Sequence, residues 1–194
     1  MLNPLFNSSA DHFLGSATAA IELVEYGDFQ CKECQYVYPE IKALQKVLDG
    51  QLRFIFRHFP LPNIRPISLE AAIAVEAAAL QEKFWHMHNT IFENRRNLTR
   101  SSLFSFAKEI DLDMDLYEAS HEYKIVFQKV INDFESGVKS GVDKTPTVFI
   151  NGLRYNGVID FDSLYKTCTY VLSHTTTAEY YNKRGGRTFE NEIP

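Results

Sequence analysis

The stretch Ile21–Cys34, which reads IELVEYGDFQCKEC, places a pair of cysteines shortly after a strongly apolar run. Residues 21–26 are rich in apolar and β-branched side chains, which is typical of a buried strand. From residue 31 to residue 48 apolar side chains recur at helical spacing, so residues 27–30 leave room only for a tight connection. The sequence therefore predicts a strand that is followed at once by a helix beginning at Cys31.

The first turn of that predicted helix gives the sulfur of Cys31 an unusual environment. The first N–H groups of a helix have no partner within the helix, and the helix dipole places partial positive charge there. Both effects stabilise a thiolate, which is the nucleophile in disulfide exchange. Cys34 lies three residues on, on the same side of the turn, so the pair can close a compact disulfide. We expect Cys31 to attack and Cys34 to resolve, with Cys31 the more exposed and more acidic thiol.

Outward from this pair, the patterns predict a mixed α/β chain. Leu52–Arg57 is a second apolar run, so strand, helix and strand form a βαβ unit with a right-handed crossover. Residues 68–140 are almost entirely helical in pattern, and Thr99 is a predicted helix cap. Two short strands then flank an Asn-Gly pair, the strongest short hairpin signal, and a last amphipathic helix follows. These later elements are the strands at 147–150 and 153–156 and the helix at 161–172.

Composition narrows the classes of function. The chain has 194 residues, 45% of them hydrophobic, and 20 Lys and Arg against 25 Asp and Glu give a net charge of −5. That balance shows no basic footprint for nucleic acid, and no apolar stretch approaches the length of a membrane span. Residues 1–16 lack the features of a signal peptide, which predicts a cytoplasmic protein, or a periplasmic one if a leader has been removed. Three cysteines are too few for a disulfide scaffold.

The order of elements and a series of motifs resemble the DsbA-like branch of the thioredoxin superfamily. The motifs are EYGDFQCxxC at 25–34, Pro39, FRHFPL at 56–61, KFWxMH at 83–88 and GVxxTPT at 141–147. The resemblance covers roughly residues 11 to 172 and implies a thioredoxin fold, βαβ then ββα, with an inserted all-helical subdomain. The expected division is an irregular lead-in at 1–20, a thioredoxin-like domain at 21–64 and 141–172, a helical insertion at 65–140 and a polar tail at 173–194.

The resemblance also implies roles for residues outside the cysteine pair. In this family the proline matching Pro146 is cis, packs against the disulfide and leaves the backbone of the preceding residue, here Thr145, to pair with an extended substrate. Glu25 matches a buried acid that accepts the proton of the resolving cysteine, and a buried carboxylate should have a raised pKa. The alternative for Glu25 is an exposed side chain paired with Arg57 of the neighbouring strand.

The function implied is thiol:disulfide oxidoreduction on disulfide- or thiol-containing proteins, peptides or small thiols, together with an unidentified redox partner. Lys32 and Glu33 replace the Pro-His or Pro-Tyr pairs common in this branch, so we expect reduction or isomerisation more than strong oxidation. Similar domains occur attached to membrane transporters, which leaves a redox-sensing or partner-binding module as an alternative. A glutathione-dependent transferase or isomerase is a third, and the intact Cys31 and Cys34 pair argues against it.

Other candidate residues have structural interpretations. No cofactor is expected and no metal, because zinc usually takes four ligands and the sequence has no second cysteine cluster. We expect His58 to be structural or at the rim of the site, and Cys168 to be a small buried hydrophobe. An aromatic-rich group on one predicted helix should form the core of the helical insertion. Its members are Phe84, Trp85, Met87 and Phe92.

Overall fold

The computed structural model describes residues 1–94, 98–120 and 122–174, and it has the mixed α/β fold that the sequence predicts. Five strands form one sheet in the order β1-β3-β2-β4-β5, with β2 and β3 parallel and the other pairs antiparallel. The strands are β1 His12–Leu14, β2 Ile21–Gly27, β3 Leu52–His58, β4 Thr147–Ile150 and β5 Leu153–Arg154. The predicted tail lies outside the described residues apart from its first two, which end the last helix.

Helices cover both faces of the sheet because β2 and β3 are buried on both sides. Alternate residues of a strand point to opposite faces, so Leu23 packs into one core cluster and Val24 into another. The first cluster includes side chains of α1, Lys32–Val47, and α7, Phe161–His174. The second is packed by Phe134 of α6. The fold therefore buries the middle of β2, where Glu25 lies.

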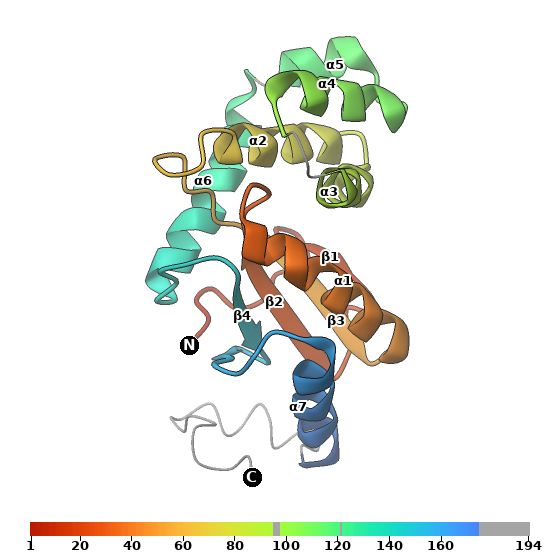
Figure 1. The fold of residues 1–194 in the computed structure, drawn as a ribbon, viewed down its shortest axis with the longest axis vertical. Coiled ribbons are helices and arrows are strands. Elements are labelled where there is room, and N and C mark those ends of the chain that lie inside the picture. Colours follow the sequence, from red (N-terminus) through yellow and green to blue (C-terminus); the bar gives the residue numbers. More distant parts are fainter. Residues whose placement is uncertain (95–97, 121, 175–194) are drawn as a thin grey trace.

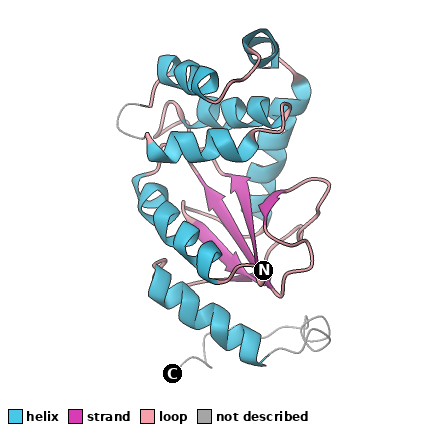
Figure 2. Ribbon diagram, turned by 90° about the vertical axis from the view of Figure 1, so that its right-hand side faces the viewer, coloured by secondary structure: helices cyan, strands magenta, loops and turns pink. Residues whose placement is uncertain are grey.

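The chain between β3 and β4 forms a block of helices at one end of the sheet (Figure 1). Figure 2 shows the strands below this block. The sequence predicts one helical stretch over 116–138, whereas the structure has two helices there, α5 and α6. The helices are α2 Ser68–Ala79, α3 Phe84–Glu93, α4 Arg100–Glu109, α5 Met114–Ser120 and α6 Lys124–Lys139. The boundary between the helical insertion and the thioredoxin-like domain stays a prediction.

Thr99 caps α4 as expected. Its hydroxyl accepts the Ser102 N–H, and the Ser102 hydroxyl in return accepts the Thr99 N–H at 2.8 Å, which makes a capping box. In the predicted hairpin, Asn151 and Gly152 have φ of 48° and 80°. Positive φ at both central residues is the geometry that favours Asn-Gly turns. The returning strand β5 ends at Arg154, two residues earlier than expected.

Residues 1–20 differ from the irregular lead-in that the sequence predicts. His12–Leu14 forms β1, which pairs antiparallel with β3 and covers one of its edges. Just before it, the Asp11 carboxylate accepts two hydrogen bonds from the buried Arg57 guanidinium, at 2.8 and 2.9 Å. A buried charge is tolerated only when it is paired. The start of the chain is therefore held to the sheet by strand pairing and by this ion pair.

Candidate active site

The junction between β2 and α1 is built around the side chain of Asp28. Its carboxylate accepts the N–H of Gln30 at 2.8 Å and the N–H of Leu61 at 3.2 Å, and its backbone carbonyl accepts the N–H of Cys31. Cys31 has extended backbone geometry and is the N-cap of α1. The tight connection that the sequence predicts thus places Cys31 at the helix start, with Cys34 inside the first turn.

Polar groups from three segments surround the sulfur of Cys31. Its Sγ lies 3.2 Å from the backbone oxygen of Thr145 and 3.2 Å from Oε2 of Glu33. Nη2 of Arg65 donates to the same sulfur at 3.4 Å. These groups leave Cys31 with 0% of its surface exposed, equal to Cys34. The expectation that Cys31 is the more exposed thiol is therefore wrong, since side chains and a loop distant in sequence cover it.

The two thiols differ in acidity in the direction that the sequence predicts. A hydrogen bond from Cys34 lowers the pKa of Cys31 to about 7, against the opposing effect of burial. Burial raises the pKa of Cys34 well above its usual value, and the interaction with Cys31 adds to that rise. All three cysteines carry free thiols in this structure. At neutral pH the charge therefore resides on Cys31, the sulfur that a nucleophilic role requires.

The loop before β4 lies against Cys31. The peptide bond between Thr145 and Pro146 is cis, and the carbonyl of Thr145 is the one that contacts the Cys31 sulfur. Thr145 is buried, and Thr147 begins β4. The role of Thr145 and Pro146 in binding an extended substrate stays a prediction.

Arg65 is the residue of this site that the sequence analysis did not identify. It lies in the connection between β3 and α2, where no periodicity draws attention to it. Besides the contact with Cys31, its Nη1 donates to Oδ2 of Asp28 and to Oγ1 of Thr145, each at 3.2 Å. The guanidinium thus joins the three segments of the site, and its positive charge favours a thiolate at Cys31.

Glu25 is buried in the middle of β2, with 3% of its surface exposed. Burial and, to a smaller extent, the charge of Cys31 raise the pKa of Glu25 to about 8, against a hydrogen bond with Cys34 that lowers it. The raised pKa confirms the expectation for a buried acid. Pairing with Arg57 is contradicted, because Glu25 is in register with Phe56 and Arg57 with Tyr26, so the two side chains point to opposite faces.

The remaining predicted residues have these positions. Lys32 and Glu33 are exposed in the first turn of α1, and the hydrogen bond from Cys31 lowers the pKa of Glu33. His58 is fully buried at the end of β3, so its role is structural and a place at the rim is wrong. Cys168 is buried in the main core, where burial raises its pKa to about 12. The aromatic-rich group of α3 packs in that same core.

A buried polar cluster lies near the base of the helical block and was not expected from the sequence. Ligand atoms of His58, Glu76 and Asp133 come within 4.8 Å of one another. The carboxylate of Glu76 pairs with His58 at 2.8 Å and with His12 at 3.0 Å, and that of Asp133 pairs with Lys129 at 2.6 Å. Because cationic and imidazole groups of the chain itself bind these carboxylates, the cluster is a buried ion-pair network.

Comparisons with known proteins agree with this geometry. A family model described as thioredoxin matches residues 7–168. Among solved structures, the thiol-disulfide exchange protein alpha-DsbA2 from Wolbachia pipientis has a TM-score of 0.75 at 23% identity, over 84% of this chain and 88% of its own. Oxidised BdbD from Bacillus subtilis has a TM-score of 0.76 at 22% identity, over 86% of this chain and 95% of its own. At this identity the likeness shows the fold alone.

Curated relatives carry the name of a transporter. The Na(+)/H(+) antiporter NhaA 1 of Mycolicibacterium vanbaalenii is 35% identical over 159 residues, which are 80% of this chain and 26% of the relative. The antiporter NhaA of Herminiimonas arsenicoxydans is 34% identical over 194 residues, which are 100% of this chain and 29% of the relative. The chain thus spans about a quarter of the length of these relatives. Among the residues that the structure describes, no helix has the length and apolarity needed to cross a membrane.

Proposed function

We propose that this chain, which belongs to the thioredoxin family, is a DsbA-like thiol:disulfide oxidoreductase acting through Cys31 and Cys34. The observation that carries the proposal is the opposite acidity of the two thiols at the start of α1, beside the cis-proline loop. A thiolate that is formed near neutral pH next to a protonated thiol provides one sulfur to attack and another to resolve.

The reaction proceeds in two steps. The Cys31 thiolate attacks one sulfur of a substrate disulfide, which forms a mixed disulfide and expels one substrate thiolate. In the mixed disulfide Cys31 carries no charge and no longer raises the pKa of Glu25. The Glu25 carboxylate accepts the proton of Cys34, and Cys34 attacks the sulfur of Cys31, which releases the second substrate thiolate and leaves a Cys31–Cys34 disulfide. Two electrons pass from the protein dithiol to the substrate, and the reverse sequence oxidises a substrate dithiol.

The substrate lies along the loop of Thr145 and Pro146. Proline has no N–H, so the Thr145 backbone is the part of this loop that can pair with an extended chain. A peptide in this position brings its disulfide to Cys31, since the Thr145 carbonyl already contacts that sulfur. The substrate class is a disulfide- or thiol-containing protein or peptide.

The acidity of Cys31 supports a direction of electron flow. Its pKa of about 7 matches the roughly 7 of thioredoxin and lies far above the roughly 3.5 of the strong oxidant DsbA. A thiolate that is less stabilised makes the reduced form less favourable and the disulfide a weaker oxidant. The protein therefore reduces or isomerises disulfides in preference to oxidising dithiols. Its location in the cell stays a prediction.

Reduction of insulin by the protein with a dithiol donor tests the proposal. We expect turnover in the native chain, its loss in Cys31→Ser, and accumulation of mixed disulfides in Cys34→Ser. Alkylation of the reduced protein with limiting reagent should modify Cys31 first. Cys168→Ser is the matched control and should keep full turnover, since Cys168 lies on the buried face of α7, in the core. Turnover that survives in Cys31→Ser, or first labelling of Cys34, would contradict the assignment.

A second candidate is a redox-sensing module attached to a transporter. The match to about a quarter of the length of the NhaA relatives favours it. Such a module would exchange disulfides with a partner segment stoichiometrically and without sustained turnover. The insulin assay separates the two functions, because oxidation of Cys31 and Cys34 in the absence of turnover supports the sensor.

A further inference from the structure

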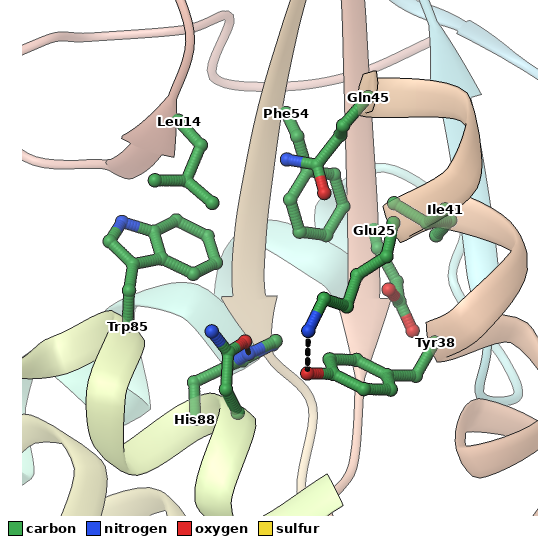
Figure 3. Close-up of a pocket in the computed structure, with 10 residues that line it drawn as sticks. Leu14, Glu25, Tyr38, Ile41, Gln45, Phe54, Trp85 and His88 are labelled. Atoms are coloured by element: carbon green, nitrogen blue, oxygen red, sulfur yellow. Dashed lines mark hydrogen bonds between the residues drawn. The ribbon is translucent and has the colours of Figure 1, made fainter. Parts of the chain in front are cut away.

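A small pocket lies at Glu25, between β2, α1 and α3 (Figure 3). The residues that line it include Glu25, Tyr38, Lys42, His88 and Asn89. About 10 Å³ of its space is open to the centre of a water molecule, close to the 10–15 Å³ that one buried water needs. The pocket therefore has the size of a single-water site rather than that of a substrate site.

Two buried polar atoms at this pocket have no hydrogen-bond partner within the protein. They are Oε1 of Glu25 and Nε2 of His88, in residues that are 3% and 2% exposed. Leaving a buried polar atom unsatisfied costs about 1–3 kcal/mol, so such atoms usually have an ordered water as partner. Both residues line the pocket, so a water held there is the partner that the protein itself does not supply.

The tautomer of His88 determines how that water is oriented. Nδ1 of His88 lies 3.1 Å from Oδ1 of Asn89, and an amide oxygen only accepts, so Nδ1 carries the hydrogen. Burial lowers the pKa of His88 to about 3, which keeps the ring neutral and Nε2 an acceptor. A water bound at Nε2 would therefore donate one hydrogen to His88, which leaves its lone pairs free to face Glu25.

The outer rim of the pocket is polar and reaches solvent. The hydroxyl of Tyr38 donates to Oε1 of Glu93 at 2.7 Å, and Nζ of Lys42 donates to the same hydroxyl at 3.0 Å. The side chain of Lys42 is 48% exposed. Tyr38, Lys42 and Glu93 thus form a hydrogen-bonded group on the solvent side of the pocket.

We propose that this pocket holds one water through which the proton of Glu25 leaves to solvent, and that His88 is the positioning residue that orients this water. The inference rests on the proposed function. When Cys34 attacks, its proton passes to the Glu25 carboxylate, then to the pocket water and out at the rim formed by Tyr38 and Lys42. Glu25 returns to its carboxylate form, and no electrons move in this branch of the reaction.

The charged and titratable groups that face Glu25 and His88 come from several elements. Glu25 faces Cys31 and Cys34 at the start of α1. His88 faces His58 of β3, Lys42 of α1 and Glu93 of α3. Changes at those residues alter the titration of the route, so its test changes His88 and leaves them in place.

Stopped-flow reaction of the reduced protein with a small aromatic disulfide separates the two steps. The first thiolate release reports attack by Cys31, and the second reports attack by Cys34. In His88→Leu we expect the second phase to slow by about tenfold relative to the first and its pH profile to move up by about one unit. His88→Gln, which keeps an acceptor at the pocket, should restore most of the rate. His86→Leu makes the same change at an exposed position of α3 and should match the native chain.

The outcomes also separate this inference from the function on which it rests. If Glu25→Gln slows the second phase but His88→Leu and His88→Gln both match the native rate and pH profile, the water route is wrong and the proposed function stands. If neither phase depends on Cys31, the function itself fails. Should His88→Leu not fold, a high-resolution crystal structure of the native protein decides the question, because a pocket without an ordered water would overturn the inference.

Discussion

Arg65 gives the Cys31 sulfur a positive neighbour that lies far away in the sequence. The guanidinium is held by Asp28 and Thr145, so its Nη2 stays directed at the sulfur. The positive charge of Arg65 and the dipole at the start of α1 both favour the thiolate form of Cys31.

Arg65→Gln should therefore raise the pKa of Cys31 by about one unit, since a hydrogen bond to a charged group contributes about 1.5–3 kcal/mol and each pKa unit is about 1.4 kcal/mol. Ultraviolet absorbance of the thiolate against pH measures this shift. Arg100→Gln removes the same charge at the exposed pair with Glu70 and should leave the titration unchanged. An equal pKa in Arg65→Gln and the native chain would exclude Arg65 from the control of the thiolate.

Glu25 makes the stability of the fold depend on pH. Its pKa is raised to about 8 in the folded state by burial, whereas in the unfolded chain it is near 4.3. Between these values the folded state binds one more proton than the unfolded state, so the free energy of unfolding falls as pH rises. The contribution of the protonated carboxyl is complete below the unfolded pKa and is lost as pH passes the folded one.

Glu25→Gln should remove this dependence and raise stability near pH 7, at about 1.4 kcal/mol for each pKa unit of the original shift. Urea unfolding from about pH 5 to about pH 6 measures it, below the range in which Cys31 titrates in the folded state. Glu118→Gln, at an exposed position of α5, is the matched control and should retain the native slope. If the free energy of unfolding of Glu25→Gln fell with pH as steeply as that of the native chain, Glu25 would not be the source of the pH dependence.

At the scale of elements, α6 joins the helical block to the sheet through a close approach at Gly137. A Cβ at this position would lie 2.6 Å from the ring of Phe59 and 3.1 Å from that of Tyr26. The Tyr26 hydroxyl forms a 2.8 Å hydrogen bond with Ser136, next to the glycine. The helix therefore packs against the sheet without space for a side chain.

Gly137→Ala should destabilise the protein by about 1–3 kcal/mol through overpacking, reduced by the roughly 1 kcal/mol by which alanine favours a helix over glycine. Denaturant unfolding measures the difference. Val138→Ala changes the neighbouring exposed position of α6 and should have a much smaller effect. An increase in stability in Gly137→Ala would show that the rings of Phe59 and Tyr26 move aside easily.

The elements that the sequence predicts well are those with a strong local pattern. The apolar runs of β2 and β3 and the Asn-Gly turn are encoded within a few residues each, so their positions are correct. β1 was missed because a strand of three residues has no room for a period. The split between α5 and α6 was missed because both helices continue a similar apolar spacing.

The residues of the candidate site likewise divide into those close together in the sequence and those that only the fold brings together. Cys31, Cys34 and Glu25 belong to one stretch of sequence and could be identified together. Arg65 lies 34 residues from Cys31 and 80 from Thr145, so only the fold brings these groups into contact. The pocket between Glu25 and His88 likewise depends on α3 packing against β2, which no local pattern encodes.

At the scale of the whole molecule, the reduction potential sums all the effects on the thiol pair. The hydrogen bond from Cys34, the start of α1 and Arg65 favour the Cys31 thiolate, whereas burial and the carboxylate of Glu33, 3.2 Å from the sulfur, oppose it. The balance is a pKa of about 7. We therefore expect a potential nearer the roughly −270 mV of thioredoxin than the roughly −120 mV of DsbA.

Replacing Glu33 should lower the pKa of Cys31 and raise the reduction potential. Glu33→His removes a negative charge beside the sulfur and adds a group that can become positive, so the pKa of Cys31 should fall and the reduced form should gain stability. Each pKa unit corresponds to roughly 30 mV in a two-electron couple, and Glu33→Gln, which removes the charge alone, should give a smaller rise. Equilibration with glutathione buffers measures the reduction potentials of the native chain, Glu33→His and Glu33→Gln. A native potential near −120 mV, or a downward shift in Glu33→His, would mean that a group other than Glu33 controls the thiolate.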